Sequence, residues 1–183
     1  GTGLYEMEGF EEVARETMET PFGEPSDEFV RTRSGPHEVI FLPRHGRGHH
    51  ILPSEINHRA NIWAFKKLGV DAVLSVSAVG SLREDMHPRD IVFPDQYFDR
   101  TKRSMDHTFF GRGVVAHISF AEPVCADLRG AVARAAEAVC GRDEEHGHVR
   151  VHDGGTYVNM EGPAFSTKAE SFFYRKMDFD VIG

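Results

Sequence analysis

Residues 43–50, PRHGRGHH, concentrate hydrogen-bond donors in one short turn. Two arginines and three histidines occur here, and a glycine stands on either side of Arg47. An arginine can hold an oxyanion through two parallel hydrogen bonds, and glycine lets the backbone turn sharply and approach a ligand. The pattern favours a site for a small anion such as phosphate, with Arg44 and His45 as donors. A solvated basic turn is the alternative that these residues alone leave open.

Two other segments carry groups that bind anions. SVSAVGSL, at residues 75–82, has serines at 75, 77 and 81, and GTGL, at residues 1–4, has Thr2 between two glycines. Hydroxyls and backbone amides in a glycine-containing turn can hold an anion. Each segment alone is typical of an ordinary turn, but three such segments in one small chain favour a shared phosphate site.

The histidines also raise the alternative of a metal site. His45, His49, His50 and His58 are close in sequence, but no carboxylate or cysteine spacing completes a ligand set. Adjacent histidines also point in different directions. We therefore expect no metal and no cofactor.

The donor turn lies between a predicted strand and a predicted helix. VIFL, at residues 39–42, is the short apolar run expected of a strand covered on both faces. Residues 53–69 predict a helix that Ser54 caps and Gly69 stops. A second buried strand is expected over residues 72–80, which implies a right-handed crossover and a parallel pair. Ligands of open α/β sheets bind beyond the carboxyl ends of strands, where the donor turn would lie.

The rest of the chain continues this alternation. We expect β segments within residues 90–98, 114–120 and 150–160, and a last buried strand in DFDVIG at residues 178–183. A long helix begins at Pro123 and ends at Gly141, and Ser166 caps a shorter one. The long helix should present one apolar face, formed by Val124, Leu128, Val132, Ala135 and Val139. The fold class predicted is α/β, with three layers and a central twisted mixed or parallel sheet flanked by helices.

Composition narrows the classes of protein. A chain of 183 residues that is 40% hydrophobic predicts one domain, and a net charge of -8 disfavours a nucleic-acid partner. No apolar run approaches the roughly 20 residues that cross a bilayer, so a cytoplasmic location without a membrane partner is expected. Cys125 and Cys140 are fifteen residues apart on one predicted helix, too far to bridge. They are expected to be free core thiols.

The chain resembles the purine nucleoside phosphorylase superfamily, in its 5'-methylthioadenosine phosphorylase branch, over nearly its whole length. The collinear blocks are GTGLY, PRHGRGHHILPSEINHRANIWAFKKLGV, SVSAVGSLREDMHPRDIVFPDQYFDRTK, HISFAEPVC and GTYVNMEGPAFSTKAES. The resemblance implies phosphorolysis of 5'-methylthioadenosine to adenine and 5-methylthioribose 1-phosphate, in purine and methionine salvage. It also implies inorganic phosphate as co-substrate, and a homo-oligomer, typically a trimer.

The resemblance assigns roles to ten residues. Those matching phosphate-binding positions are Thr2, Arg44, His45, Ser77 and Ala78, the last through its backbone. Those matching nucleoside-binding positions are Met160 and Glu161 for the sugar, Phe165 for the base, Ser166 for substrate choice, and His117 near the 5' substituent of a neighbouring subunit. Glu161 as a turn carboxylate and Phe165 as a core residue stay open as alternatives. No residue is expected to act as a nucleophile.

Some parts of the family pattern are not present in residues 1–183. Residues 1–183 are expected to form a single phosphorylase domain that is incomplete. The parts expected to be missing from it are the opening strand and the C-terminal part, with acidic residues that bind the purine. Met177 and Asp178 stand where relatives usually carry Trp and Gly. The alternatives kept open are a 5'-methylthioinosine or 6-oxopurine nucleoside phosphorylase, and a non-catalytic module that binds phosphate or nucleoside.

Overall fold

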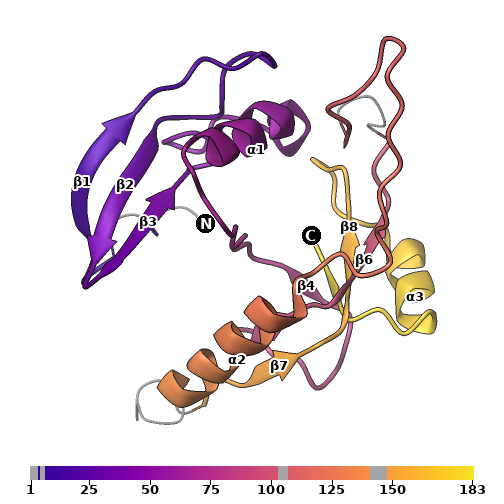
Figure 1. The fold of residues 1–183 in the computed structure, drawn as a ribbon. Helices are drawn as coiled ribbons and strands as arrows, with labels where there is room; N and C mark the ends of the chain where they lie inside the picture. The colour runs from indigo at the N-terminus through magenta and orange to yellow at the C-terminus, as the bar shows by residue number, and fades with distance from the viewer. Residues whose placement is uncertain (1–3, 5–6, 103–106, 141–147) are drawn as a thin grey trace. The chain divides into compact units, whose positions relative to one another are not determined.

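The computed structural model describes residues 4, 7–102, 107–140 and 148–183 (Figure 1). They belong to two compact units, the first formed by Gly1–Ser77 and Lys102–Val115 and the second by Ala78–Thr101 and Ala116–Gly183. That they make up one domain stays a prediction.

The first unit contains a three-stranded antiparallel sheet. Its strands are β1 (Glu11–Glu16), β2 (Phe29–Ser34) and β3 (His37–Phe41), with β2 in the centre. A two-residue turn joins β2 to β3, and its first residue, Gly35, has φ +57°, as hairpin turns of this length require. The central strand carries the buried side chains of the sheet.

The helix α1 (His58–Lys67) packs on this sheet through a narrow apolar stripe. Ile56, Ala60 and Ala64 are buried, and the Phe65 ring lies edge-on to Phe29 at 5.2 Å between centroids. Gly69, at φ +79°, follows the last turn, so its predicted place at the helix end is confirmed.

The predicted cap at Ser54 is wrong. Pro53–Glu55 forms a separate 3-10 turn, in which the Glu55 carboxylate accepts the N–H of Leu52 at 2.9 Å. The α-helix begins later because Asn57 accepts the N–H of Ala60 at 3.1 Å, while its amide donates to the carbonyl of Phe22 at 2.7 Å.

Two predicted strands are not formed. Residues 71–79 form neither helix nor strand and are exposed, with Leu74 63% exposed, and only Gly80 of the predicted strand enters β4 (Gly80–Ser81). Residues 114–120 are also exposed and unpaired in the described chain. The predicted parallel pair with β3 is therefore wrong, since β3 pairs antiparallel with β2. Apolar runs predict burial, but a strand also needs a neighbour for its backbone N–H and C=O groups.

The second unit holds a mixed four-stranded sheet in the order β4-β9-β8-β6. Its parallel strands are β6 (Gln96–Asp99), β8 (Thr156–Asn159) and β9 (Val181–Ile182), and β4 runs antiparallel to β9. The core cluster on one face of this sheet consists of Leu82, Val158, Tyr174 and Ile182, with Met160 and Phe179 against it. The β segment predicted within residues 150–160 and the strand predicted within residues 178–183 are thus confirmed.

Tyr174 belongs to α3 (Lys168–Lys176), and through it this helix contributes to the core. Thr167, not the predicted Ser166, caps the helix. Its hydroxyl accepts the N–H of Glu170 at 3.2 Å, and the Glu170 carboxylate accepts the N–H of Thr167 at 2.7 Å. This reciprocal pair outcompetes the Ser166 hydroxyl, which lies 2.8 Å from that of Ser171.

A second, two-stranded parallel sheet pairs β5 (Ile91–Phe93) with β7 (Val151–Asp153), and α2 (Ala126–Cys140) contacts β7. The strands of the described residues thus divide among three sheets, with helices against them, and the class is α/β. No described helix is long and apolar enough to span a bilayer.

The predicted apolar face of α2 is partly wrong. The helix begins at Ala126 rather than Pro123, and Val139 is 63% exposed while Ala133 and Cys140 are buried. One turn of an α-helix takes 3.6 residues, so small errors in a series of three- and four-residue steps add up along a long helix. The predicted face therefore contains Val132 and Val139, whereas their neighbours Ala133 and Cys140 are the buried residues. Both cysteines are free, but Cys125 is exposed and is not a core thiol. Gly141 lies outside the described residues.

Candidate active site

The donor turn is closed by backbone hydrogen bonds. The N–H of Gly46 donates to Pro43 at 2.8 Å, and the N–H of Ile51 donates to His45 at 3.0 Å. Gly46 and Gly48 have φ of +71° and +81°, and a Cβ on Gly46 would collide with the His50 ring. The turn therefore needs glycine on both sides of Arg47, as the sequence predicts.

His45 is held in one tautomer. Its Nδ1 lies 2.9 Å from the carbonyl oxygen of Ile51, which can only accept, so Nδ1 carries the proton. Burial lowers the pKa of His45, and the positive charge of Arg44 lowers it further. The ring stacks on His49 at 4.5 Å. Near neutral pH the imidazole is uncharged, and its Nε2 is left as an acceptor.

Arg44 connects the turn to a segment far away in sequence. Its Nη1 donates to the carbonyl of Val76 at 3.1 Å, and Val76 directly precedes Ser77. The first unit thus brings two of the three predicted anion-binding segments together. Thr2 lies outside the described residues. Ala78 is exposed and is the first residue of the second unit.

Arg47 has different surroundings from Arg44. Its N–H donates to the Asp27 carboxylate at 2.5 Å, and its Nη1 lies 3.5 Å from the Glu28 carboxylate. These acidic partners fix the turn against the segment before β2 and offset one of its two arginine charges. Asp27 was not among the candidate residues, because nothing in the spacing of a residue twenty positions away indicates that it meets this turn.

The predicted nucleoside-binding residues all lie in the second unit. Met160 and Glu161 directly follow β8, both half-buried, and Met160 packs against the core cluster. Phe165 is 93% exposed, which overturns the alternative that it is a core residue. Ser166 contacts the first turns of α3 through Ser171, and His117 is exposed.

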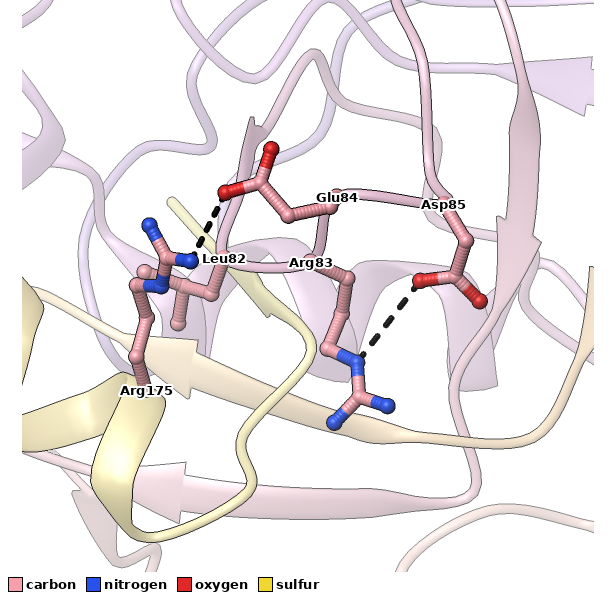
Figure 2. A pocket seen from close by; sticks show the side chains of 5 residues that line it. All are labelled: Leu82, Arg83, Glu84, Asp85 and Arg175. Atoms are coloured by element: carbon pink, nitrogen blue, oxygen red, sulfur yellow. Dashed lines mark hydrogen bonds and ion pairs between the residues drawn. The ribbon is translucent and has the colours of Figure 1, made fainter.

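A separate open pocket of about 280 Å³ in the second unit contains none of these residues (Figure 2). It is lined by Leu82, Arg83, Glu84, Asp85 and Arg175. Its arginines already face carboxylates: Arg175 lies 2.7 Å from Glu84, and Arg83 lies 2.9 Å from Asp178. These ion pairs join the segment after β4 to the end of α3, so the pocket offers a stabilising contact rather than an anion site. Among the described residues, no group of three or more His, Cys, Asp or Glu side chains could hold a metal ion.

The family model of the phosphorylase superfamily matches residues 1–183. The chain belongs to the phosphorylase superfamily. The S-methyl-5'-thioadenosine phosphorylases of Geobacter sulfurreducens and Gloeobacter violaceus are 57% and 55% identical to this superfamily member over 183 residues. The chain is covered completely in both alignments and spans 61% and 60% of the length of these curated relatives.

Solved structures of this superfamily are similar as well. A methylthioadenosine phosphorylase from an Antarctic soil metagenomic library has a TM-score of 0.91 and 47% identity, over all of this chain and 62% of that one. A methylthioadenosine phosphorylase from Schistosoma mansoni, in complex with adenine, has a TM-score of 0.89 and 38% identity, over all of this chain and 70% of that one. The α/β class inferred from the sequence is thereby confirmed.

Proposed function

We propose that the protein catalyses phosphorolysis of 5'-methylthioadenosine. The observation that carries this proposal is the geometry of the donor turn, in which Arg44 donates to the carbonyl of Val76, next to Ser77. This geometry suits phosphate binding, and the names of the relatives state the same activity. In the reaction a phosphate oxygen forms a bond to ribose C1' while the bond from C1' to the purine nitrogen breaks. The bonding electrons leave with adenine, which takes up a proton.

The phosphate half of the reaction falls to the first unit. Arg44 would bind the oxyanion with two parallel hydrogen bonds, and Ser77 and Thr2 would add hydroxyl donors. His45, neutral and protonated on Nδ1, would accept a hydrogen bond from a protonated phosphate oxygen at Nε2. Positioned in this way, phosphate itself stabilises the positive charge that develops on the sugar, so the protein needs neither a nucleophile nor a cofactor.

The nucleoside half falls to the second unit. Glu161 would accept hydrogen bonds from the ribose hydroxyls, with Met160 beside the sugar. Phe165 would stack on the base, and its 93% exposure leaves its ring available for that contact. Ser166 would bear on the choice of purine, and His117 would reach the 5' substituent bound by a neighbouring copy. We also propose a homotrimer, a cytoplasmic location and a role in purine and methionine salvage.

Release of adenine by the full-length gene product tests the proposal. With 5'-methylthioadenosine and phosphate we expect adenine and a sugar phosphate in equal amounts, and no adenine when phosphate is left out. Faster release of hypoxanthine from 5'-methylthioinosine or inosine would instead favour a 6-oxopurine enzyme. Binding of nucleoside and phosphate at one equivalent each, with no base released, would show a non-catalytic binding protein.

A further inference from the structure

Asp99 and Asn159 end two neighbouring parallel strands at the same level. They are register partners in the pairing of β6 with β8, so their side chains lie on the same face of the sheet. The Asn159 side-chain amide donates to the Asp99 carboxylate at 3.2 Å. Register partners one strand apart are close enough for such side-chain pairs, so the strand pairing itself brings the two groups together.

The same carboxylate oxygen of Asp99 also turns the chain after β6. It accepts the N–H of Thr101 at 2.9 Å, an arrangement typical of aspartate at the start of a turn. The N–H of Arg100 donates at 2.9 Å to the carbonyl of Asn159. Asn159 is therefore held by its side chain and by its backbone against the end of β6.

The third parallel strand holds the next residue from the other side. The N–H of Met160 donates to the carbonyl of Gly183 at 2.9 Å, and the N–H of Gly183 donates to Val158 at 3.1 Å. A Cβ on Gly183 would meet the Tyr157 hydroxyl, so a side chain there would require the Tyr157 ring to move. The chain leaving β8 is thus fixed on both sides immediately before Glu161.

We propose that Asp99 and Asn159 are positioning residues for the nucleoside. Their hydrogen bond sets the direction in which the chain leaves β8, and so the place of Glu161, without either group touching the reacting atoms. The proposal rests on the proposed function, because the direction matters for activity only if Glu161 binds the ribose. Removing the bond would let residues 160 and 161 sample other conformations, which costs nucleoside binding rather than phosphate binding.

Steady-state kinetics of four variants and one control variant of the full-length gene product test this inference. Asp99→Ala and Asn159→Ala should each raise KM for 5'-methylthioadenosine about tenfold, with KM for phosphate within about twofold. Asp99→Asn should stay within about threefold of the unchanged protein, because its amide oxygen can still accept from Thr101 and Asn159. The double variant should be close to Asp99→Ala, because that single change already removes the bond shared with Asn159 together with the bond to Thr101. Glu84→Ala, which removes an exposed carboxylate in the pocket of Figure 2, is the matched control and should change neither KM.

The outcomes separate the positioning role from a structural one. Unchanged KM for the nucleoside in Asp99→Ala and Asn159→Ala would overturn the inference. So would equal losses in both KM values together with a lower melting temperature, with Asp99→Asn as poor as Asp99→Ala. Calorimetric titration with 5'-methylthioadenosine tests the two proposals separately. If the unchanged protein binds the nucleoside but releases no adenine, the proposed function is refuted. Weaker binding by Asp99→Ala would still support Asp99 and Asn159 as positioning residues. An unchanged protein that neither binds nor cleaves overturns both.

Discussion

Arg44 and Arg47 lie three positions apart in one turn and have opposite surroundings. Arg47 faces Asp27 and Glu28, whereas Arg44 donates to a backbone carbonyl, which takes up none of its charge. The turn therefore directs one full positive charge toward the segment of Ser77. An oxyanion bound there would gain charge-assisted hydrogen bonds, which are roughly twice as strong as neutral ones.

Replacing Arg44 should separate phosphate use from nucleoside binding. We expect Arg44→Ala to raise KM for phosphate about 100-fold, corresponding to about 2–3 kcal/mol for lost charge-assisted hydrogen bonds. Binding of 5'-methylthioadenosine, measured by calorimetry without phosphate, should change less than about threefold. Arg175→Ala, which removes an arginine paired with Glu84, serves as the control and should affect neither measurement. An equal loss of both affinities in Arg44→Ala would mean that the turn supports the fold instead.

At the scale of elements, a buried carboxylate joins the β5–β7 sheet to the loop before it. The side chain of Asp90 is only 5% exposed. Its oxygens accept the N–H of His87 at 2.9 Å, the His152 ring at 3.0 Å and the N–H of Arg150 at 3.2 Å. The His87 N–H bond is the main reason why the pKa of Asp90 falls from 3.8 to about 2, with His152 adding to it.

This low pKa predicts how stability responds to acid. A carboxyl group whose pKa is lower in the folded than in the unfolded protein stabilises the fold above its unfolded pKa, and the contribution is lost as pH falls. Asp90→Asn should lower the free energy of unfolding by about 2 kcal/mol near neutral pH. The difference between the two proteins should then shrink as the pH falls from about 4 to about 2. Chemical denaturation across that range measures it, and a difference that does not depend on pH would contradict the role of the charge.

Local patterns predicted most elements, and local competition explains the errors. Gly69 follows the last turn of α1 with a positive φ, a conformation that glycine adopts most readily. The presence of a glycine is therefore enough to predict the end of this helix from the sequence. The caps were harder to assign, since Ser54 and Asn57, or Ser166 and Thr167, are all suitable residue types. Further hydrogen bonds decide which residue caps each helix. The side-chain amide of Asn57 also donates to the carbonyl of Phe22, and the backbone N–H of Thr167 donates to Glu170, three residues later.

At the scale of the molecule, the residue pattern predicted part of the candidate site, and the roles that the family resemblance adds stay predictions. Pattern alone identified the turn around Arg44 and the serines near residue 77, which the structure joins through Val76. It did not find Asp27 or Asp99, because the partners of these carboxylates are set by how segments meet. It also predicted a buried strand at residues 72–80 and a β segment at residues 114–120, where apolar side chains are exposed in the described chain. An apolar run in the sequence predicts that its side chains will be covered, but it does not identify the segment or partner that covers them.

The exposed segment around His117 bears on the proposed trimer. Ile118 and Phe120 are 76% and 66% exposed, and side chains of this kind are expected inside an interface between copies. We expect Ile118→Asp to shift the gene product from trimer to monomer in sedimentation at micromolar concentration, because an unpaired charge in an apolar interface costs on the order of 2–3 kcal/mol per copy. Glu137→Ala, a change at an exposed polar position on α2, is the control and should leave the mass unchanged. A trimer that survives Ile118→Asp, or a wild-type monomer, would refute this interface.

Because the two cysteines differ in exposure, residues 1–183 offer a single thiol for selective labelling. Cys125 is open to solvent beside the first turn of α2, while Cys140 is buried at the other end of the same helix. A maleimide dye added to the native protein will therefore modify the first thiol and spare the second. Its fluorescence would report on the surroundings of the second unit during nucleoside binding without any change to the amino-acid sequence.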